Sequence, residues 1–345
     1  MPAVRRKSWL AGLLSLFMPG LGQVYNGQAL KGVVFYCLYG SVVLACGVIL
    51  LELSFAPLNV IFPLGVILAG YLYILVDAIK TARRQRETFQ PKLYNRWYVY
   101  PAIIVLLAFV IQPTVSSTIR KVWMQAFKIP AESMKTTLLV GDHILVNKLR
   151  YRLTPPQRFD VIVFHYPWEK DRDFIKRVIG LPGDRVLVRD GQVLVNDQPL
   201  QEPYARYTAS TASPRHDTFG PVVVPKKGDR IEIRSDKRLY LNGGPVPIPS
   251  GLFRPRSDNA PMSGLEIFYG ALLPPGTTLQ QTLAPRPVEH DYYFVLGDNR
   301  DNSQDSRYWG FVPRVNILGP AQRLYWSWDR DTAHVRWERI GQSVR

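Results

Sequence analysis

Long apolar runs dominate the first third of the chain. The twenty residues from Gly32 to Leu51 contain no charged side chain, and neither does the run from Phe55 to Val76. A third run, Trp97 to Ile111, is shorter but continues through the uncharged segment Gln112 to Thr118. About twenty apolar residues span the hydrocarbon core of a bilayer, which is about 30 Å thick. The pattern therefore predicts three transmembrane helices.

The apolar segment from Trp9 to Met18 is too short to span a bilayer. Three basic residues precede it at positions 5 to 7, so it mimics a secretory signal peptide. However, Pro19 stands at the would-be cleavage site, and two longer apolar runs follow directly. We therefore expect a re-entrant or interfacial helix here. The stretch from Pro19 to Gly27 resembles the turn of small two-helix membrane modules called TM2-like domains.

Beyond Lys121 the chain changes to short β-like runs bounded by Gly, Pro and Asp. No long amphipathic helix and no internal repeat is visible there, so we expect a mainly β domain of antiparallel sheets. The stretch from Pro199 to His290 is rich in Pro, Gly, Ser and Thr, which predicts a β-rich insertion or cap. The predicted strands are His143–Val146, Asp160–Phe164, Phe174–Ile179, Arg185–Val188, Val193–Val195, Arg230–Arg234 and Tyr292–Leu296.

These elements divide the chain into four parts. Lysines and arginines concentrate on the cytoplasmic side of membrane proteins. Because the N-terminus and the loop before Trp97 are both basic, we expect both to be cytoplasmic. Residues after about Thr118 then lie outside the cytoplasm. The parts are 1–80 (a membrane module with an interfacial segment and two transmembrane helices), 81–96 (a basic cytoplasmic loop), 97–119 (the third transmembrane helix) and 120–345 (an extracytoplasmic β-rich domain with a cap-like insertion at about 199–290).

The net charge of +16 is spread over the whole chain. Residues 1–118 contain ten Lys and Arg against three Asp and Glu, and the remainder contains 33 against 24. The outer domain is thus basic but mixed, without a long basic run, which argues against a nucleic-acid partner. Attraction to anionic lipid head groups explains such a surface more simply. Cys37 and Cys46 both lie in the first apolar run, so we expect no disulfide and no catalytic thiol in the outer domain.

Ser133 is a candidate nucleophile in the segment Ile129–Met134 (IPAESM). Pro130 biases the residue before it towards extended geometry, so the serine follows an extended stretch and stands at a turn. A serine in such a place is more often an ordinary turn residue. It becomes nucleophilic at neutral pH only beside a base. None of the five histidines has neighbours that indicate this role.

Lys176 is the candidate base. In an extended strand it shares a face with Phe174 and Val178, and burial of a lysine lowers its pKa. To act as a base at neutral pH, a lysine needs a pKa lowered from about 10.4 to about 7–8. This shift corresponds to destabilising the charged amine by roughly 4 kcal/mol. Arg177 lies on the opposite face, so we expect one of the two cations to point outward, and periodicity does not say which. Lys135 has polar neighbours and is expected to stay solvated and charged.

A long polar segment, Gly297–Gly310, follows the last predicted strand. Its own side chains can hold it as a turn through Asx hydrogen bonds. A hydroxyl from Ser303 or Ser306 can orient a buried neutral lysine amine, which needs a hydrogen-bond partner. Three aspartates make a calcium loop conceivable, but two interleaved arginines repel a cation and can pair the carboxylates, so we expect no metal. These residues are Asp298, Asp301 and Asp305, with Arg300 and Arg307.

These three segments, in this order, resemble the bacterial type I signal peptidases (leader peptidases), which are membrane-bound proteases with a Ser/Lys dyad. The resemblance covers roughly Lys121 to Asp197 and His290 to Trp326. It implies that Ser133 is the nucleophile, that Lys176 is the general base and that no cofactor is needed. It also implies supporting roles for four residues. Ser303 would hold the lysine amine in place, and a carboxylate–guanidinium pair would brace the site, with a further serine beside it. These four are Ser303, Asp305, Ser306 and Arg307.

The resemblance also implies a substrate and a place in the cell. Exported preproteins would be cut after an Ala-x-Ala-like sequence, with the substrate backbone added as a strand. The protein would be a multi-pass protein of the bacterial cytoplasmic membrane, with the lipid bilayer and the secretion machinery as further partners. Residues that would contact substrate, and line shallow pockets for small side chains, are Ile129, Pro130, Ala131, Met134, Leu138, Ile144, Phe174 and Ile175.

Three positions depart from the family pattern. Many relatives have a serine where this chain has Ala131, and its hydroxyl helps to form the oxyanion hole, so here the hole would rest on the Ser133 backbone N–H. Thr136 stands in place of a proline, and Phe159 stands in place of the glycine of an Arg-Gly-Asp turn. Two rival interpretations remain. A self-cleaving Ser/Lys repressor-type protease would carry a DNA-binding module instead of membrane spans, and a membrane-anchored scaffold derived from a peptidase would have lost activity.

Overall fold

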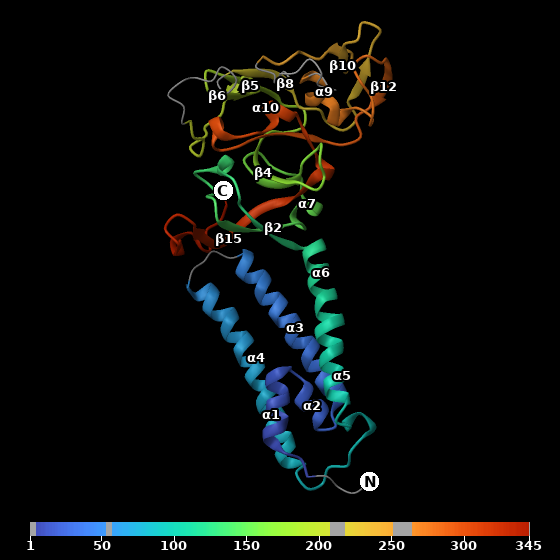
Figure 1. Cartoon of the computed structure of the whole chain (residues 1–345), viewed down its shortest axis with the longest axis vertical. Helices are drawn as coiled ribbons and strands as arrows, with labels where there is room; N and C mark the ends of the chain where they lie inside the picture. The colour runs from blue at the N-terminus through green and yellow to red at the C-terminus, as the bar shows by residue number, and fades with distance from the viewer. Residues whose placement is uncertain (1–4, 53–56, 208–217, 251–263, 345) are drawn as a thin grey trace. The chain divides into compact units, whose positions relative to one another are not determined.

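The computed structural model describes residues 5–52, 57–207, 218–250 and 264–344 (Figure 1). The chain divides into two compact units, Met1–Arg120 and Lys121–Arg345. The first unit consists of helices and the second consists mainly of strands. We describe each unit by itself.

The first unit contains three helical segments that are long and apolar enough to cross a membrane: Ala29–Gly47, Ile61–Arg84 and Val99–Val122. The prediction of three apolar helices is confirmed, although Phe55 and Ala56 of the second predicted span lie outside the described residues. The short apolar segment forms a ten-residue helix. The elements are α1 (Ser8–Phe17), α2 (Leu21–Tyr25), α3 (Ala29–Glu52), α4 (Pro57–Arg84), η1 (Leu93–Asn95), α5 (Val99–Leu106), the π-helical η2 (Leu107–Ile111) and α6 (Gln112–Val122).

The turn around α2 joins the helices of this unit. Gly20 has φ +95°, and a Cβ there would lie 2.2 Å from the backbone oxygen of Gly32, so the close approach of these segments requires glycine. Two polar side chains of the turn donate to the backbone of α4. Gln23 Nε2 lies 2.8 Å from the oxygen of Ile74, and Asn26 Nδ2 lies 2.8 Å from that of Ala78. These bonds satisfy polar groups within an otherwise apolar packing.

The second unit is built on an eight-stranded antiparallel sheet in the order β1-β2-β15-β3-β4-β13-β14, with β16 paired to β15. Two four-stranded sheets, β7-β6-β5-β8 and β11-β10-β9-β12, complete it. The elements of the large sheet are β1 (Met124–Lys128), β2 (Asp142–Asn147), β3 (Val161–His165), β4 (Asp173–Gly180), β13 (Tyr292–Leu296), β14 (Val312–Pro313), β15 (Ile317–Asp329) and β16 (His334–Val335).

The smaller sheets include most of the described part of the predicted insertion. Their strands are β5 (Arg185–Arg189), β6 (Gln192–Val195), β7 (Gln198–Pro199), β8 (Phe219–Val223), β9 (Arg230–Ile233), β10 (Leu239–Leu241), β11 (Gly244–Pro245) and β12 (Leu283–Pro287). Short helices connect the strands of the unit: η3 (Glu132–Met134), α7 (Arg150–Leu153), α9 (Gly264–Tyr269), η4 (Gly270–Leu272), η5 (Arg300–Asn302), α10 (Ser306–Trp309), η6 (Arg314–Asn316) and η7 (Trp337–Arg339).

The expected β-rich fold class is confirmed, and every predicted strand is present within about a residue of its expected ends. The thirteen-residue strand β15 was not predicted, although it lies between β2 and β3 in the large sheet. Its sequence mixes Gly319, Pro320 and two charged residues, Arg323 and Asp329, with apolar ones and so lacks a clean alternation. The pairing of β15 with β2 and with β3 also shows register shifts. Such irregularities interrupt the two-residue alternation of side chains along the strand.

Candidate active site

Ser133 lies in the short helix η3, directly after the extended segment that continues β1. That segment runs through Pro130 to Ala131, which is still extended, and the backbone N–H of Ile129 donates to the oxygen of Asp142, so the large sheet holds the approach to the serine. Ser133 Oγ accepts a hydrogen bond from Lys176 Nζ at 2.8 Å. The structure thus brings together two candidates that are 43 residues apart in the chain.

Lys176 is buried on β4, with only 2% of its surface exposed. Its Nζ also donates to the backbone oxygen of Ile175 at 2.9 Å and lies 5.5 Å from the centre of the Phe174 ring. The loss of hydration disfavours the charged amine, and burial lowers the pKa of Lys176 to about 8. A useful fraction of the amine is therefore neutral near physiological pH.

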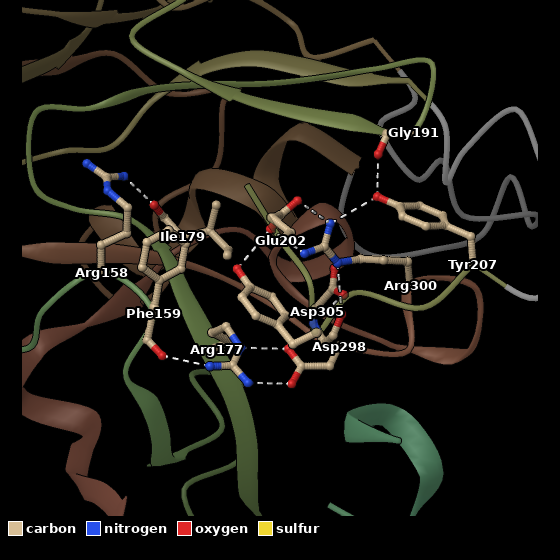
Figure 2. Close-up of polar contacts among 12 residues, drawn as sticks. Arg158, Phe159, Arg177, Ile179, Gly191, Glu202, Tyr207, Asp298, Arg300 and Asp305 are labelled. Atoms are coloured by element: carbon tan, nitrogen blue, oxygen red, sulfur yellow. Dashed lines mark hydrogen bonds and ion pairs between the residues drawn. The ribbon is translucent and has the colours of Figure 1, made fainter. Parts of the chain in front are cut away.

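Arg177 is also buried, with 1% exposure, so the expectation that one of the two cations points outward is wrong. Its guanidinium forms a bidentate pair with Asp298, with nitrogen–oxygen distances of 2.8 and 2.6 Å (Figure 2). The same side chain donates to the backbone oxygen of Phe159, and the ring of Tyr204 stacks on it at 3.8 Å. Both faces of β4 are covered because other segments of the chain pack on the second face. The alternation of residues within the strand does not reveal that cover.

The polar segment after β13 is held by a second buried ion pair. Asp305 contacts Arg307 at 2.8 Å and accepts a hydrogen bond from the Gly297 backbone at 3.0 Å. Burial alone would raise the pKa of Asp305, but Arg307 and these hydrogen bonds hold it below its usual value. Ser306 Oγ accepts from the Val295 backbone at 2.9 Å and so ties the segment to β13.

Ser303 is buried next to Gly297 and Ser133. A Cβ built on Gly297 would lie 2.1 Å from Ser303 Oγ and 2.6 Å from the backbone oxygen of Ser133, so only glycine allows these segments to meet. Ser303 Oγ has no hydrogen-bond partner among the described residues. The lysine amine donates to Ser133 Oγ and to the Ile175 oxygen, and orientation of the amine by Ser303 stays a prediction.

A groove of about 590 Å³ opens beside Ser133 and Lys176. Five of the eight residues expected to contact substrate line it: Ile129, Pro130, Ala131, Phe174 and Ile175. The other three are fully buried in a core cluster with Val163 and Leu324, so the structure does not place them on the groove surface. Their expected role in lining the pockets is not supported, because core packing uses their whole surface. They are Met134, Leu138 and Ile144.

One wall of the groove is an open strand edge. Residues Asp173–Lys176 of β4 pair with β3 on one side, whereas the pairing of β4 with β13 begins only at Arg177. The opposite wall includes Ile129 to Ala131, which continue β1 as far as η3, and β1 pairs with β2 alone in the described sheet. Both walls therefore present backbone groups that can pair with an added extended segment.

Several residues of the site carried no local signal in the sequence. The groove is also lined by polar residues that the motifs did not single out: Glu132, Arg172, Asp173, Asn302 and Gln304. Glu202, at the start of the predicted insertion, pairs with Arg300 at 2.5 Å across 98 residues (Figure 2). Tyr204 comes from the same stretch. Such partners are set by contacts distant in sequence, which a reading of single segments cannot detect.

The two departures at Thr136 and Phe159 have visible structural consequences. Phe159 has φ +73°, so a bulky residue takes the left-handed conformation that glycine adopts more easily. Its ring packs edge-on against Tyr204 at 6.0 Å. Thr136 has φ +108°, which proline cannot adopt, and its hydroxyl donates to the backbone oxygen of Tyr204 at 2.6 Å. Both positions thus contact the insertion rather than the groove.

Comparison with known proteins points to one family. The profile described as "Signal peptidase, peptidase S26" matches residues 95–227 and 222–326. A signal peptidase I from Aquifex aeolicus is 39% identical over 217 residues, which cover 61% of this chain and 78% of that protein. A signal peptidase I from Pseudomonas aeruginosa is 31% identical over 256 residues, covering 66% of this chain and 68% of the relative.

The crystal structure of a signal peptidase I from Enterococcus faecalis is 26% identical to this chain, with a TM-score of 0.26; the match covers 48% of this chain and 97% of that one. The family match itself begins at residue 95 and includes Ser133, Lys176 and the polar segment after β13. The match extends over well more than half of the chain. The chain therefore belongs to the signal peptidase family, peptidase S26.

Proposed function

We propose that this protein is a membrane-bound serine endopeptidase that removes signal peptides from exported preproteins. Ser133 is the nucleophile and Lys176 is its general base. The observation that carries this assignment is the 2.8 Å contact between Lys176 Nζ and Ser133 Oγ, made by a lysine whose pKa burial lowers to about 8. Family membership supports the same activity, because the relatives are signal peptidases.

The reaction is an acyl transfer. The lone pair of neutral Lys176 accepts the Ser133 proton as Oγ attacks the scissile carbonyl carbon. The protonated amine then gives this proton to the nitrogen of the leaving peptide as the carbon–nitrogen bond breaks. The acyl-enzyme that remains is hydrolysed by a water that Lys176 deprotonates. The short contact and the rigid position of the lysine on β4 align these transfers without further movement.

The oxyanion of the tetrahedral intermediate needs hydrogen-bond donors. The backbone N–H of Ser133 lies in the first turn of η3, where N–H groups lack partners within the helix. Ala131 has no hydroxyl to add as a second donor. Because one lost donor typically costs about 10²–10³ in rate, we expect the Ala131→Ser variant to be at least as active as the wild type.

The substrate binds as an extended strand in the groove. Its backbone pairs with the open edge of β4 and with the segment that continues β1, and the apolar groove residues favour small side chains near the cut. An Ala-x-Ala-like sequence satisfies these limits. In the proposed topology the basic N-terminus and the segment 81–96 are cytoplasmic, and the β unit lies outside the cytoplasm of the bacterial cell. There it meets preproteins that the secretion machinery delivers.

Cleavage of a preprotein by the full-length protein in lipid tests this proposal. We expect Ser133→Ala and Lys176→Ala to reduce kcat/KM by at least about 10²-fold, the lower range for loss of general acid–base catalysis. Lys135→Ala is the matched control, because Lys135 is partly exposed and pairs with Glu132. A folded wild type without activity would favour the scaffold interpretation, and full activity of Lys176→Ala would show that another group is the base.

A further inference from the structure

A second cavity, of about 610 Å³, lies in the helical unit, far from any residue of the groove in the sequence. It is formed by the segment that leads into α1 and by the C-terminal end of α4 with the residues after it. Its lining contains five cations and no carboxylate: Arg5, Arg6, Lys7, Arg83 and Arg86. Like charges this close repel one another unless an anion is bound between them.

Arg6 supplies an independent observation. It is 93% buried, since only 7% of its surface is exposed, and its guanidinium contacts two aromatic rings. The distances are 4.1 Å to the ring centre of Tyr25 and 3.6 Å to that of Phe89. Two of its nitrogens, Nε and Nη2, have no hydrogen-bond acceptor within the described part of the chain. Buried donors are rarely left without an acceptor, so these two N–H groups favour an acceptor supplied from outside the described residues.

The walls of the cavity are held in place before any ligand binds. The Arg6 backbone N–H donates to the oxygen of Arg86 at 3.1 Å, which joins the two sides. The Lys7 backbone N–H donates to the Tyr25 hydroxyl at 3.2 Å. The helix α1 begins at Ser8, so the unpaired N–H groups of its first turn add a further preference for an anion.

The position of the cavity along the helices identifies the kind of anion. The apolar segment Ile61–Arg84 of α4 ends in the same turn that supplies Arg83, so the cavity lies at the end of a candidate membrane span. Lipid phosphates lie at this level, and basic pockets beside transmembrane helices bind anionic head groups. Trp9, which also lines the cavity, is 63% exposed, and tryptophan is enriched at the membrane interface.

We propose that this cavity binds the phosphate group of an anionic phospholipid. The guanidinium groups of Arg83, in the last turn of α4, and of Arg86, just beyond its end, meet the phosphate oxygens, and the stacked Arg6 forms the positive wall behind them. Arginine suits this role because its planar fork matches two phosphate oxygens at once. A soluble phosphate compound presents the same group, so the experiment below includes both sources.

Calorimetric titration of the delipidated full-length protein, in a neutral detergent, tests the proposal. The probes are dihexanoyl phosphatidylglycerol, dihexanoyl phosphatidylcholine and inorganic phosphate. We expect saturable binding of the phosphatidylglycerol, about 30-fold weaker in the double variant Arg83→Gln/Arg86→Gln. The matched control is Lys80→Gln/Arg84→Gln, which removes the same charge from the same end of α4 at positions that do not line the cavity. We expect less than about a threefold change in the control.

The outcomes separate the possibilities. Equal weakening in both double variants would overturn the proposal, because it would show diffuse attraction to a basic surface, and so would the absence of saturable binding of any probe. Phosphatidylglycerol binding that inorganic phosphate does not displace supports a lipid occupant. If inorganic phosphate binds as tightly, the phosphate site stands but its occupant is a soluble anion, and the lipid assignment falls. Arg83 and Arg86 are both exposed, so their variants are expected to fold, and a thermal melt checks this.

Discussion

Lys176 and Arg177 are neighbours on β4 and equally buried, but their surroundings differ. Asp298 neutralises Arg177 through two hydrogen bonds, whereas within the described residues the amine of Lys176 donates to a hydroxyl and to a carbonyl oxygen. The nearby carboxylate of Asp305 is already engaged by Arg307. The comparison teaches that burial alone does not make a base. The charged form is disfavoured where the carboxylates within reach are bound to other cations.

The buried arginine pair gives the largest expected change in stability. Asp298→Asn removes the carboxylate that is paired with the buried Arg177 guanidinium, and breaking a buried pair typically costs about 3–5 kcal/mol. Thermal or denaturant unfolding of the full-length protein measures it. Glu169→Gln is the control, because its pair with Arg172 is exposed and such pairs contribute at most about 1 kcal/mol. Equal effects of the two substitutions would contradict the contrast between paired and unpaired cations.

Replacing Lys176, which has no paired carboxylate in the described residues, should stabilise the protein rather than destabilise it. Its pKa is about 8 in the folded state against about 10.5 for the free side chain, so the folded state binds fewer protons between these values and stability rises with pH there. Below pH 8 the buried charged amine destabilises the folded state by its full amount. Lys176→Met removes this amine and is therefore expected to raise the free energy of unfolding at pH 7 by roughly 3 kcal/mol. The gain should disappear above about pH 10.5. A variant that is less stable than wild type at pH 7 would show that the hydrogen bonds of the amine outweigh its desolvation.

The same pKa predicts the pH dependence of cleavage. The base must be neutral, so kcat/KM should rise about tenfold per pH unit up to a midpoint near 8 and then level off. Asp298→Asn removes a negative charge that raises the pKa of Lys176, so the midpoint should move to lower pH in that variant. A profile without this acidic limb would remove Lys176 from the role of base.

The smallest expected effect concerns the aromatic cover of Arg177. Tyr204→Leu removes a ring stacked 3.8 Å from the guanidinium, at a cost of about 1–2 kcal/mol for a desolvated cation–π contact. Tyr240→Leu is the matched control, since its ring lies 3.9 Å from Arg234 at an exposed site where the contact is worth less. We expect a smaller loss of unfolding free energy in the control, and the reverse order would show that burial does not strengthen the stack.

Local pattern in the sequence was sufficient for much of the fold. The three apolar helices, the seven predicted strands and the family resemblance all followed from residues close together in the chain. The strand β15 was missed because Gly319, Pro320 and charged residues interrupt its alternation, and only its two neighbours in the sheet make it a strand.

By itself the sequence determined which chemical groups are available, including a serine, a lysine in an apolar strand and a polar segment that contains both acidic and basic residues. Only the tertiary structure decided how those groups are paired. It buried Lys176 and Arg177 alike, assigned Asp298 to the arginine across 121 residues, and packed Met134 into the core instead of the groove. The physical reason is that periodicity records which face of a strand is apolar. The charge state of a buried group depends on the atoms that surround it, and those come from segments far away in the chain.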